Sequence, residues 1–190
     1  MTTTILLVGV GGQGTILAGD LLAKTAAKSG YDVKISEIHG MSQRGGSVST
    51  VVRFGESVSS MVVDPGCADI IISFEEIEAL RYLHYLKKDG TLFVNATQIT
   101  PVSVHIGNFE MPQDAHERLE NLGAHLLDAQ ELANSVSSPK SANVVLMGAL
   151  STKLPFNADI WREVIIERVP QKTIEKNLEA FDCGVAAASK

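Results

Sequence analysis

Cysteine and long apolar runs are the scarcest features of this sequence. Only Cys67 and Cys183 among its 190 residues are cysteines, and neither has another Cys or a His close by in the chain. Their spacing matches no zinc or iron–sulfur ligand set and no disulfide framework of a secreted domain. No apolar stretch approaches the ~20 residues needed to cross a bilayer, and residues 1–4 lack the charged start of a signal peptide. We therefore expect a cytoplasmic protein that has no membrane partner.

An excess of positive charge is also absent. Lys and Arg number 16 against 22 Asp and Glu, which gives a net charge of −6. This balance argues against a nucleic-acid partner, because such binding rests on clustered cations. Hydrophobic residues make up 45% of the chain, enough at this length to form a core without metal or disulfide support. We predict a single domain over residues 1–190.

Motifs of self-contained catalysis are missing as well. The sequence has no G-x-x-x-x-G-K-[ST] phosphate loop, no G-x-S-x-G nucleophile turn and no H-E-x-x-H metal motif. His84, His105, His116 and His125 are isolated, and the many carboxylates are expected on solvated helix faces. We therefore predict that this chain contains no catalytic residue and no metal site of its own.

The hydrophobic pattern predicts alternating strands and helices. A strand over residues 4–8, a glycine-rich turn, a helix over 15–28 and a strand over 32–38 form a βαβ unit, which implies a parallel sheet. Asp128 is placed to cap a short helix. The fold class is thus α/β, with a doubly wound, mostly parallel, Rossmann-like sheet, an antiparallel hairpin insertion and a helical C-terminal segment. The other expected elements are a hairpin of 47–54 and 58–63, strands over 69–74, 91–95 and 124–127, a candidate strand over 102–106, and helices over 75–86, 112–122, 141–150, 159–167 and 171–186.

The first candidate site is the glycine-rich turn after the first strand. Gly9, Gly11 and Gly14 form the G-x-G-x-x-G pattern, which permits a tight turn, approach to a phosphate and close packing of the helix. The alternative is that these glycines only make a compact connection. Glu37 stands near the position of a ribose-binding acid, but Ile38 continues the apolar pattern past it, so the dinucleotide fingerprint is incomplete.

The second candidate site is the loop over residues 39–46. In a parallel sheet this loop emerges at the same edge as the first turn, so we expect the two to be neighbours. Arg44 suits a carboxylate or phosphate, and His39 could titrate near neutral pH, although a hydrogen-bonded loop residue is the simpler interpretation of His39. The predicted cofactor-binding or subunit-interface residues are Gly9, Gly11, Gly12, Gln13, Gly14, His39, Ser42, Gln43, Arg44, Gly45 and Gly46.

These two loops carry a family resemblance. Residues 9–14, 36–48 and 52–54 together resemble the gamma-type domain of 2-oxoacid:ferredoxin oxidoreductases. Within that family, the loop over 39–46 is most similar to the small (beta) subunits of the indolepyruvate type. Segments 143–150 and 177–181 also fit, so the resemblance extends from Ile5 to about Gly184.

The resemblance implies a reaction that this chain cannot perform alone. In that family a 2-oxoacid, here an aryl pyruvate, is decarboxylated on thiamine diphosphate. Electrons pass through iron–sulfur clusters to ferredoxin, and the acyl group passes to coenzyme A. This chain has no thiamine-type G-D-G…N pattern and no cysteine cluster, so a larger partner subunit is expected to hold those cofactors. The two loops would face that subunit and receive part of coenzyme A, or would only allow close subunit packing.

Two other functions remain open at this point. A stand-alone NAD(P)-dependent reductase would explain the glycine pattern and would bind NAD(P)H directly. A nucleotide-sensing or interaction module would be a stable monomer that recruits no oxidoreductase subunit. A subunit that a partner normally covers should instead expose an apolar patch, and should tend to self-associate when isolated.

Overall fold

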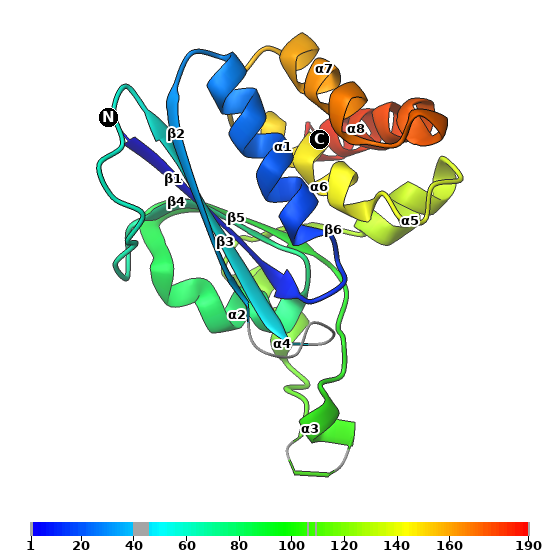
Figure 1. Cartoon of the computed structure of the whole chain (residues 1–190). Helices are drawn as coiled ribbons and strands as arrows, with labels where there is room; N and C mark the ends of the chain where they lie inside the picture. Colours follow the sequence, from blue (N-terminus) through cyan, green and yellow to red (C-terminus); the bar gives the residue numbers. More distant parts are fainter. Residues whose placement is uncertain (1, 40–45, 106, 109, 190) are drawn as a thin grey trace.

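The computed structural model describes residues 2–39, 46–105, 107–108 and 110–189. It contains a six-stranded sheet in the order β2-β3-β1-β4-β5-β6 (Figure 1). The parallel strands β1, β4, β5 and β6 are adjacent, whereas β3 runs antiparallel to its neighbours β1 and β2. The strands are β1 (Thr2–Val10), β2 (Asp32–His39), β3 (Ser47–Gly55), β4 (Ala68–Ser73), β5 (Leu86–Asn95) and β6 (His125–Leu127).

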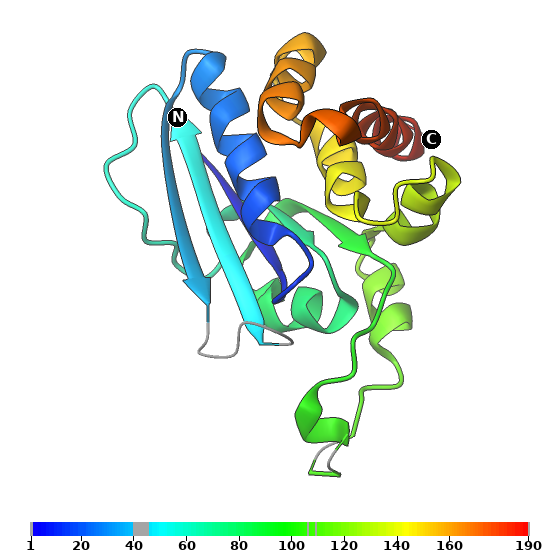
Figure 2. The same ribbon diagram turned by 45° about the vertical axis from the view of Figure 1, so that its right-hand side comes forward.

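Helices cover both faces of this sheet. In Figure 2, α1 and the C-terminal helices lie on one face, and α2 and α4 lie on the other. The segment that carries α3 extends away from the sheet in both views (Figures 1 and 2). The helices are α1 (Thr15–Lys28), α2 (Glu76–Tyr82), α3 (Val102–His105), α4 (Ala115–Asn121), α5 (Ala129–Ser135), α6 (Ala142–Ser151), α7 (Ala158–Arg168) and α8 (Ile174–Ala188), with 3-10 turns η1 (Leu83–Tyr85) and η2 (Gln171–Thr173).

The apolar run of β1 explains the two-sided arrangement. Successive side chains of a strand point to opposite faces, so Ile5 and Leu7 enter the core under α1, whereas Leu6 and Val8 enter the core under α2. A central strand that is apolar on both faces must be covered on both. The predicted α/β fold with a mostly parallel sheet is therefore confirmed.

The helical C-terminal segment packs unusually closely. A Cβ atom added to Gly148 of α6 would lie 2.0 Å from the carbonyl oxygen of Phe181, and one added to Gly184 of α8 would lie 1.9 Å from that of Val145. The two glycines therefore let the backbones of α6 and α8 approach each other. With α1, α5 and β5 also packed against α6, its residues from Asn143 to Leu150 are all buried.

The predicted hairpin of residues 47–54 and 58–63 is wrong. β3 pairs with β2, and residues 58–63 are outside the sheet. Side chains bind the backbone of this segment in place of a strand ladder: Asp32 Oδ2 accepts from the Val58 amide at 2.7 Å, and Arg53 Nη1 donates to the carbonyl of Ser60 at 2.6 Å. The β-branched residues of the segment therefore give an extended chain without strand pairing.

The candidate strand over residues 102–106 is also wrong. Residues 102–105 form the short helix α3, and residue 106 lies outside the described residues. Pro101 begins this turn, because its carbonyl accepts from the amides of Val104 and His105 at 3.0 and 3.2 Å. Proline is favoured at the start of a helix, and here it outweighs the strand preference of the valines.

The predicted helix cap at Asp128 is confirmed, since Asp128 Oδ1 accepts from the Glu131 amide at 2.7 Å at the start of α5.

Over the described part of the chain, no helix is both long and apolar enough to cross a membrane.

Candidate functional site at the carboxyl edge of the sheet

A pocket of about 470 Å³ lies where β1, β4 and β5 end. We call this side of the sheet the carboxyl edge. Ligands of open α/β sheets bind outside the carboxyl ends of the strands, and the volume is that of an ordinary ligand site. The lining residues come from the glycine-rich turn, the segments after β4 and β5, and the start of α5 and α6: Gly12, Gln13, Phe74, Asn95, Thr97, Ile99, Gln130, Pro139, Lys140, Ala142, Asn143 and Leu146.

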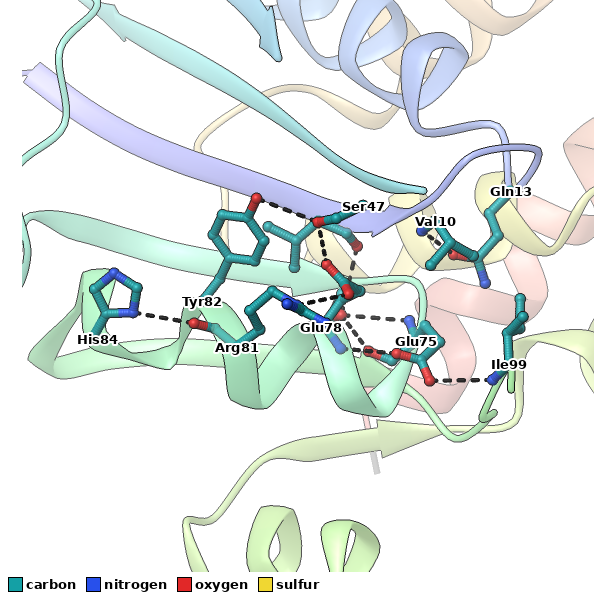
Figure 3. A network of polar contacts seen from close by, with 11 residues as sticks. Val10, Gln13, Ser47, Glu75, Glu78, Arg81, Tyr82, His84 and Ile99 are labelled. Atoms are coloured by element: carbon teal, nitrogen blue, oxygen red, sulfur yellow. Dashed lines mark hydrogen bonds and ion pairs between the residues drawn. The ribbon is translucent and has the colours of Figure 1, made fainter. Parts of the chain in front are cut away.

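Gln13 builds the wall of this pocket. Its Oε1 accepts from the amide of Val10 at 2.8 Å, and its Nε2 donates to the carbonyl of Phe74 at 2.7 Å. The side chain thus joins the end of β1 to the residue that follows β4. Figure 3 shows the first of these contacts, between Gln13 and Val10. Asn95 Nδ2 donates to the same Phe74 carbonyl at 3.3 Å, and Asn95 Oδ1 accepts from the Ala129 amide at 3.0 Å. The two carboxamides hold three strand ends together.

The glycines of the first turn have two different roles. A Cβ on Gly9 would lie 2.7 Å from Gln13 Oε1, and a Cβ on Gly14 would lie 2.5 Å from Asn143 Nδ2. Both residues therefore allow the compact strand–helix connection that the sequence left as an alternative. Gly12, with φ +105°, lines the pocket and has open space where a side chain would stand, so its backbone is bare toward the pocket.

The two loops predicted to be neighbours meet at one hydrogen bond. The Gly11 amide donates to the carbonyl of Gly46 at 2.9 Å. His39 is the last residue of β2 and pairs with Val48. Ser42, Gln43, Arg44 and Gly45 lie outside the described residues. Because the Gly11 amide already has a partner, it does not offer the free donor that a dinucleotide phosphate would need at this point.

The topology also disfavours Glu37 as a ribose ligand. In a dinucleotide-binding sheet the second strand lies beside the first, but here β3 lies between β1 and β2. Two strand spacings separate β2 from β1, about 10 Å. Glu37 is exposed on the outermost strand of the sheet. Glu37 therefore does not supply the ribose-binding acid that the dinucleotide-binding motif lacks.

The residues that follow β4 contain buried carboxylates that the sequence analysis assigned to solvated helix faces. Glu75, Glu76 and Glu78 are 1%, 3% and 4% exposed. Glu75 caps α2 by accepting from the Glu78 amide at 2.8 Å, and its other oxygen accepts from the Ile99 amide at 3.2 Å (Figure 3). Burial raises the pKa of the Glu75 carboxyl above its ordinary value. The expectation of solvated carboxylates is therefore wrong for this turn.

Glu78 and Glu76 have partners on opposite sides of α2. Glu78 accepts from the Ser47 hydroxyl and from Arg81 Nε, the latter at 2.9 Å (Figure 3). Glu76 binds Nδ1 of His116 at 2.6 Å, and this hydrogen bond raises the pKa of His116. The sequence signal for this network was available: three glutamates within four residues directly follow a buried strand. Among the described residues, no group of three or more His, Cys, Asp or Glu could hold a metal ion.

The similarities to known proteins extend over the whole chain. The family described as Pyruvate ferredoxin/flavodoxin oxidoreductase matches residues 4–187. The "Indolepyruvate oxidoreductase subunit IorB" of Thermococcus kodakarensis is 46% identical over 193 residues, which cover 98% of this chain and 96% of that protein. The gamma subunit of a keto/oxoacid ferredoxin oxidoreductase from Geobacter sulfurreducens has a similar structure, with a TM-score of 0.74, 25% identity and 98% of each chain covered.

A third similarity concerns a longer protein. The 2-oxoglutarate:ferredoxin oxidoreductase of Magnetococcus marinus, solved with 2-oxoglutarate, coenzyme A and succinyl-CoA bound, matches 99% of this chain with a TM-score of 0.75 and 22% identity. The match covers only 31% of that chain. The same fold therefore occurs both as a separate chain and as about a third of a larger one.

Together these matches define the class of protein: the chain belongs to the pyruvate ferredoxin/flavodoxin oxidoreductase family. Within the family, its likeness is to indolepyruvate oxidoreductase subunits and to gamma subunits. The resemblance of the two loops to the gamma-type domain is thereby confirmed.

Proposed function

We propose that this chain is the small subunit of a 2-oxoacid:ferredoxin oxidoreductase of the indolepyruvate type. The complex would convert aryl pyruvates to aryl-acetyl-CoA and reduce ferredoxin. The observation that carries this proposal is the 46% identity to an indolepyruvate oxidoreductase subunit along nearly the whole of both chains.

The redox cofactors belong on a partner subunit in this proposal. A four-iron cluster takes about four thiolate ligands. This chain has only Cys67, which is exposed, and Cys183, which is half-buried on α8. The chain also lacks a thiamine-type G-D-G…N pattern. Its residues therefore fit neither an iron–sulfur cluster nor thiamine diphosphate, and it would act only within the complex.

We assign the pocket at the carboxyl edge to part of coenzyme A. The carboxamides of Gln13 and Asn95 are held by backbone groups, so the wall is preorganised and a ligand need not order it. Gly12 offers bare backbone, and the exposed Lys140 offers a positive charge for a phosphate. The loop over residues 39–46, with Arg44, would complete this site at the boundary with the large subunit.

A second surface supports the presence of a partner. On the sheet face opposite α1, Ile38 and Val62 are 65% and 71% exposed and border a groove of about 430 Å³. Leu6, Val51 and Tyr82 are among the residues that line the groove. Exposed apolar patches of this kind mark interaction sites. In the sequence, Ile38 directly precedes His39, the first residue of the loop that we place against the large subunit.

The test is the coenzyme A dependence of the reconstituted complex. We expect Lys140→Ala to raise the KM for coenzyme A by roughly tenfold, the effect of losing one charge-assisted contact, with little change in kcat. Lys153→Ala is the matched control, because Lys153 is an exposed lysine outside the pocket lining. An unchanged KM in Lys140→Ala, in a complex that assembles normally, would remove the pocket from the proposal.

A further inference from the structure

The buried glutamates after β4 are the most costly feature of the carboxyl edge. We call residues Glu75–Glu78 the acidic turn. A carboxylate removed from water destabilises a fold unless hydrogen bonds or ion pairs offset its desolvation. All three glutamates of the acidic turn have such partners, and the partners are not local to α2 alone. The residues that share these hydrogen bonds indicate which parts of the site the acidic turn fixes in place.

One group of contacts leads to the loop over residues 39–46, which we call the second loop. Glu78 accepts from the hydroxyl of Ser47, the first residue of β3, and Tyr82 Oη lies 3.4 Å from the same hydroxyl oxygen (Figure 3). Gly46 directly precedes Ser47, and its carbonyl accepts from the Gly11 amide at 2.9 Å. Glu78 therefore holds the point where the second loop enters β3 and touches the glycine-rich turn.

The other group of contacts leads to the part of the pocket lining that follows β5. Glu75 accepts from the Ile99 amide at 3.2 Å, and Glu76 Oε2 accepts from Gln98 Nε2 at 2.6 Å. The Glu76 amide in turn donates to the Thr97 carbonyl at 3.0 Å. Thr97 and Ile99 both line the pocket. Three consecutive residues after β5 are thus held by the first two residues of the acidic turn.

We propose that Glu75, Glu76 and Glu78 are positioning residues that, from a single helix turn, fix the pocket wall of Thr97 and Ile99 and the start of β3 beside the glycine-rich turn. This inference rests on the proposed function, since it assigns residues to the same site. Glu78 uses both of its carboxylate oxygens, Oε2 toward Ser47 and Oε1 toward Arg81. Truncation of this side chain therefore leaves both donors without their acceptor.

The test uses Ser47 and Glu78 variants in the complex reconstituted with the large subunit. We expect Ser47→Ala and Glu78→Ala to raise the KM for coenzyme A by about tenfold, more than they change kcat, because the site is displaced and no reacting group is lost. Ser47→Thr keeps the hydroxyl and should restore the KM. Glu179→Ala is the matched control, since Glu179 forms an (i, i+3) ion pair with Lys176 on the surface of α8.

A second readout needs no activity. In the isolated chain, hydrogen exchange of the Gly11 amide should become about tenfold faster in Ser47→Ala and stay unchanged in Ser47→Thr and Glu179→Ala. If Glu78→Ala fails to fold, the comparison of Ser47→Ala with Ser47→Thr still tests the positioning role. An unchanged KM and unchanged Gly11 exchange in Ser47→Ala would overturn the positioning role while leaving the proposed function intact. A wild-type complex without coenzyme A dependence would instead contradict the proposed function, and the exchange rate would then decide the positioning role alone.

Discussion

At the scale of single residues, the environment of a side chain decides its chemistry more than its type does. Glu75 and Glu110 are both glutamates, yet Glu75 is buried and Glu110 is exposed. Burial disfavours the charged form of a carboxyl, which raises the pKa of Glu75 although two backbone amides donate to it. The folded state therefore binds the proton of Glu75 more tightly than the unfolded state does.

This shift predicts a pH dependence of stability. A carboxyl whose folded-state pKa is raised stabilises the fold at low pH, and this contribution is lost as the pH rises from the ordinary value of 4.5 through the raised pKa. We expect the free energy of unfolding of wild type, relative to Glu75→Gln, to fall over that window. Urea denaturation at a series of pH values measures the difference. Glu110→Gln, at an exposed site, should show no such trend, and parallel curves for wild type and Glu75→Gln would contradict the assignment.

The sequence predicted where the two loops meet, but not the contacts that their residues make. The G-x-G-x-x-G turn and the loop over 39–46 were expected at one edge, and the Gly11–Gly46 hydrogen bond shows that they meet there. The hydrogen bond from Gln13 Nε2 was not predictable, because its acceptor, the Phe74 carbonyl, is 61 residues away in the chain. The burial of Glu76 was missed for a similar reason, since its partner His116 is 40 residues away. The glutamates directly after a buried strand were a local signal of a buried network, but a local pattern contains no information about which distant residues complete it.

At the scale of elements, strand preference and strand pairing are separate properties. Residues 47–55 and 58–63 both favour extended chain, but only the first pairs with neighbouring strands, on both of its edges. The crossover through α1 leaves a gap between β1 and β2, and β3 fills it. Hydrophobic periodicity identifies a strand, whereas its partners follow from the topology of the whole sheet.

The close packing of α6 against α8 predicts that a larger residue at Gly148 destabilises the fold. Gly148→Ala gains about 1 kcal/mol of helix propensity, but its methyl group would overlap the Phe181 carbonyl. Overpacking against backbone costs about 1–3 kcal/mol, and the separation of 2.0 Å places Gly148→Ala at the upper end of that range. We therefore expect its free energy of unfolding to be about 2 kcal/mol lower than that of wild type. Thermal or urea unfolding measures it. Gly30→Ala, with φ +90° and open space, should lose only about 1 kcal/mol from backbone strain. A Gly148→Ala protein as stable as wild type would contradict the close α6–α8 contact.

At the scale of the whole molecule, the sheet is unevenly covered. α1 covers β2 and β3 on one face, while the opposite face presents the groove bordered by Ile38 and Val62. The similar structure from Magnetococcus marinus contains this fold within a chain about three times as long. Under the proposed function, a separate chain of the same fold would need a binding surface in place of that covalent link, and we propose the groove for this role.

This arrangement predicts the effect of charge on assembly. Ile38→Lys and Val62→Lys should each weaken binding to the large subunit by at least tenfold, because a desolvated lysine is costly at an apolar interface. Titration of the large subunit with labelled chain measures the affinity. Ile166→Lys is the control, since Ile166 is exposed on α7, away from the groove. Equal affinities of all three variants would place the partner elsewhere. The same groove predicts that isolated wild type self-associates and that Ile38→Lys does so less.

Anaerobic purification of the tagged chain from its own cells, followed by a dye-reduction assay of the proteins that accompany it, tests whether the chain is a subunit of such an oxidoreductase. We expect a large, brown partner subunit whose reduction of the dye requires both coenzyme A and indolepyruvate or phenylpyruvate. A colourless chain without a partner, or a complex indifferent to both substrates, would contradict it.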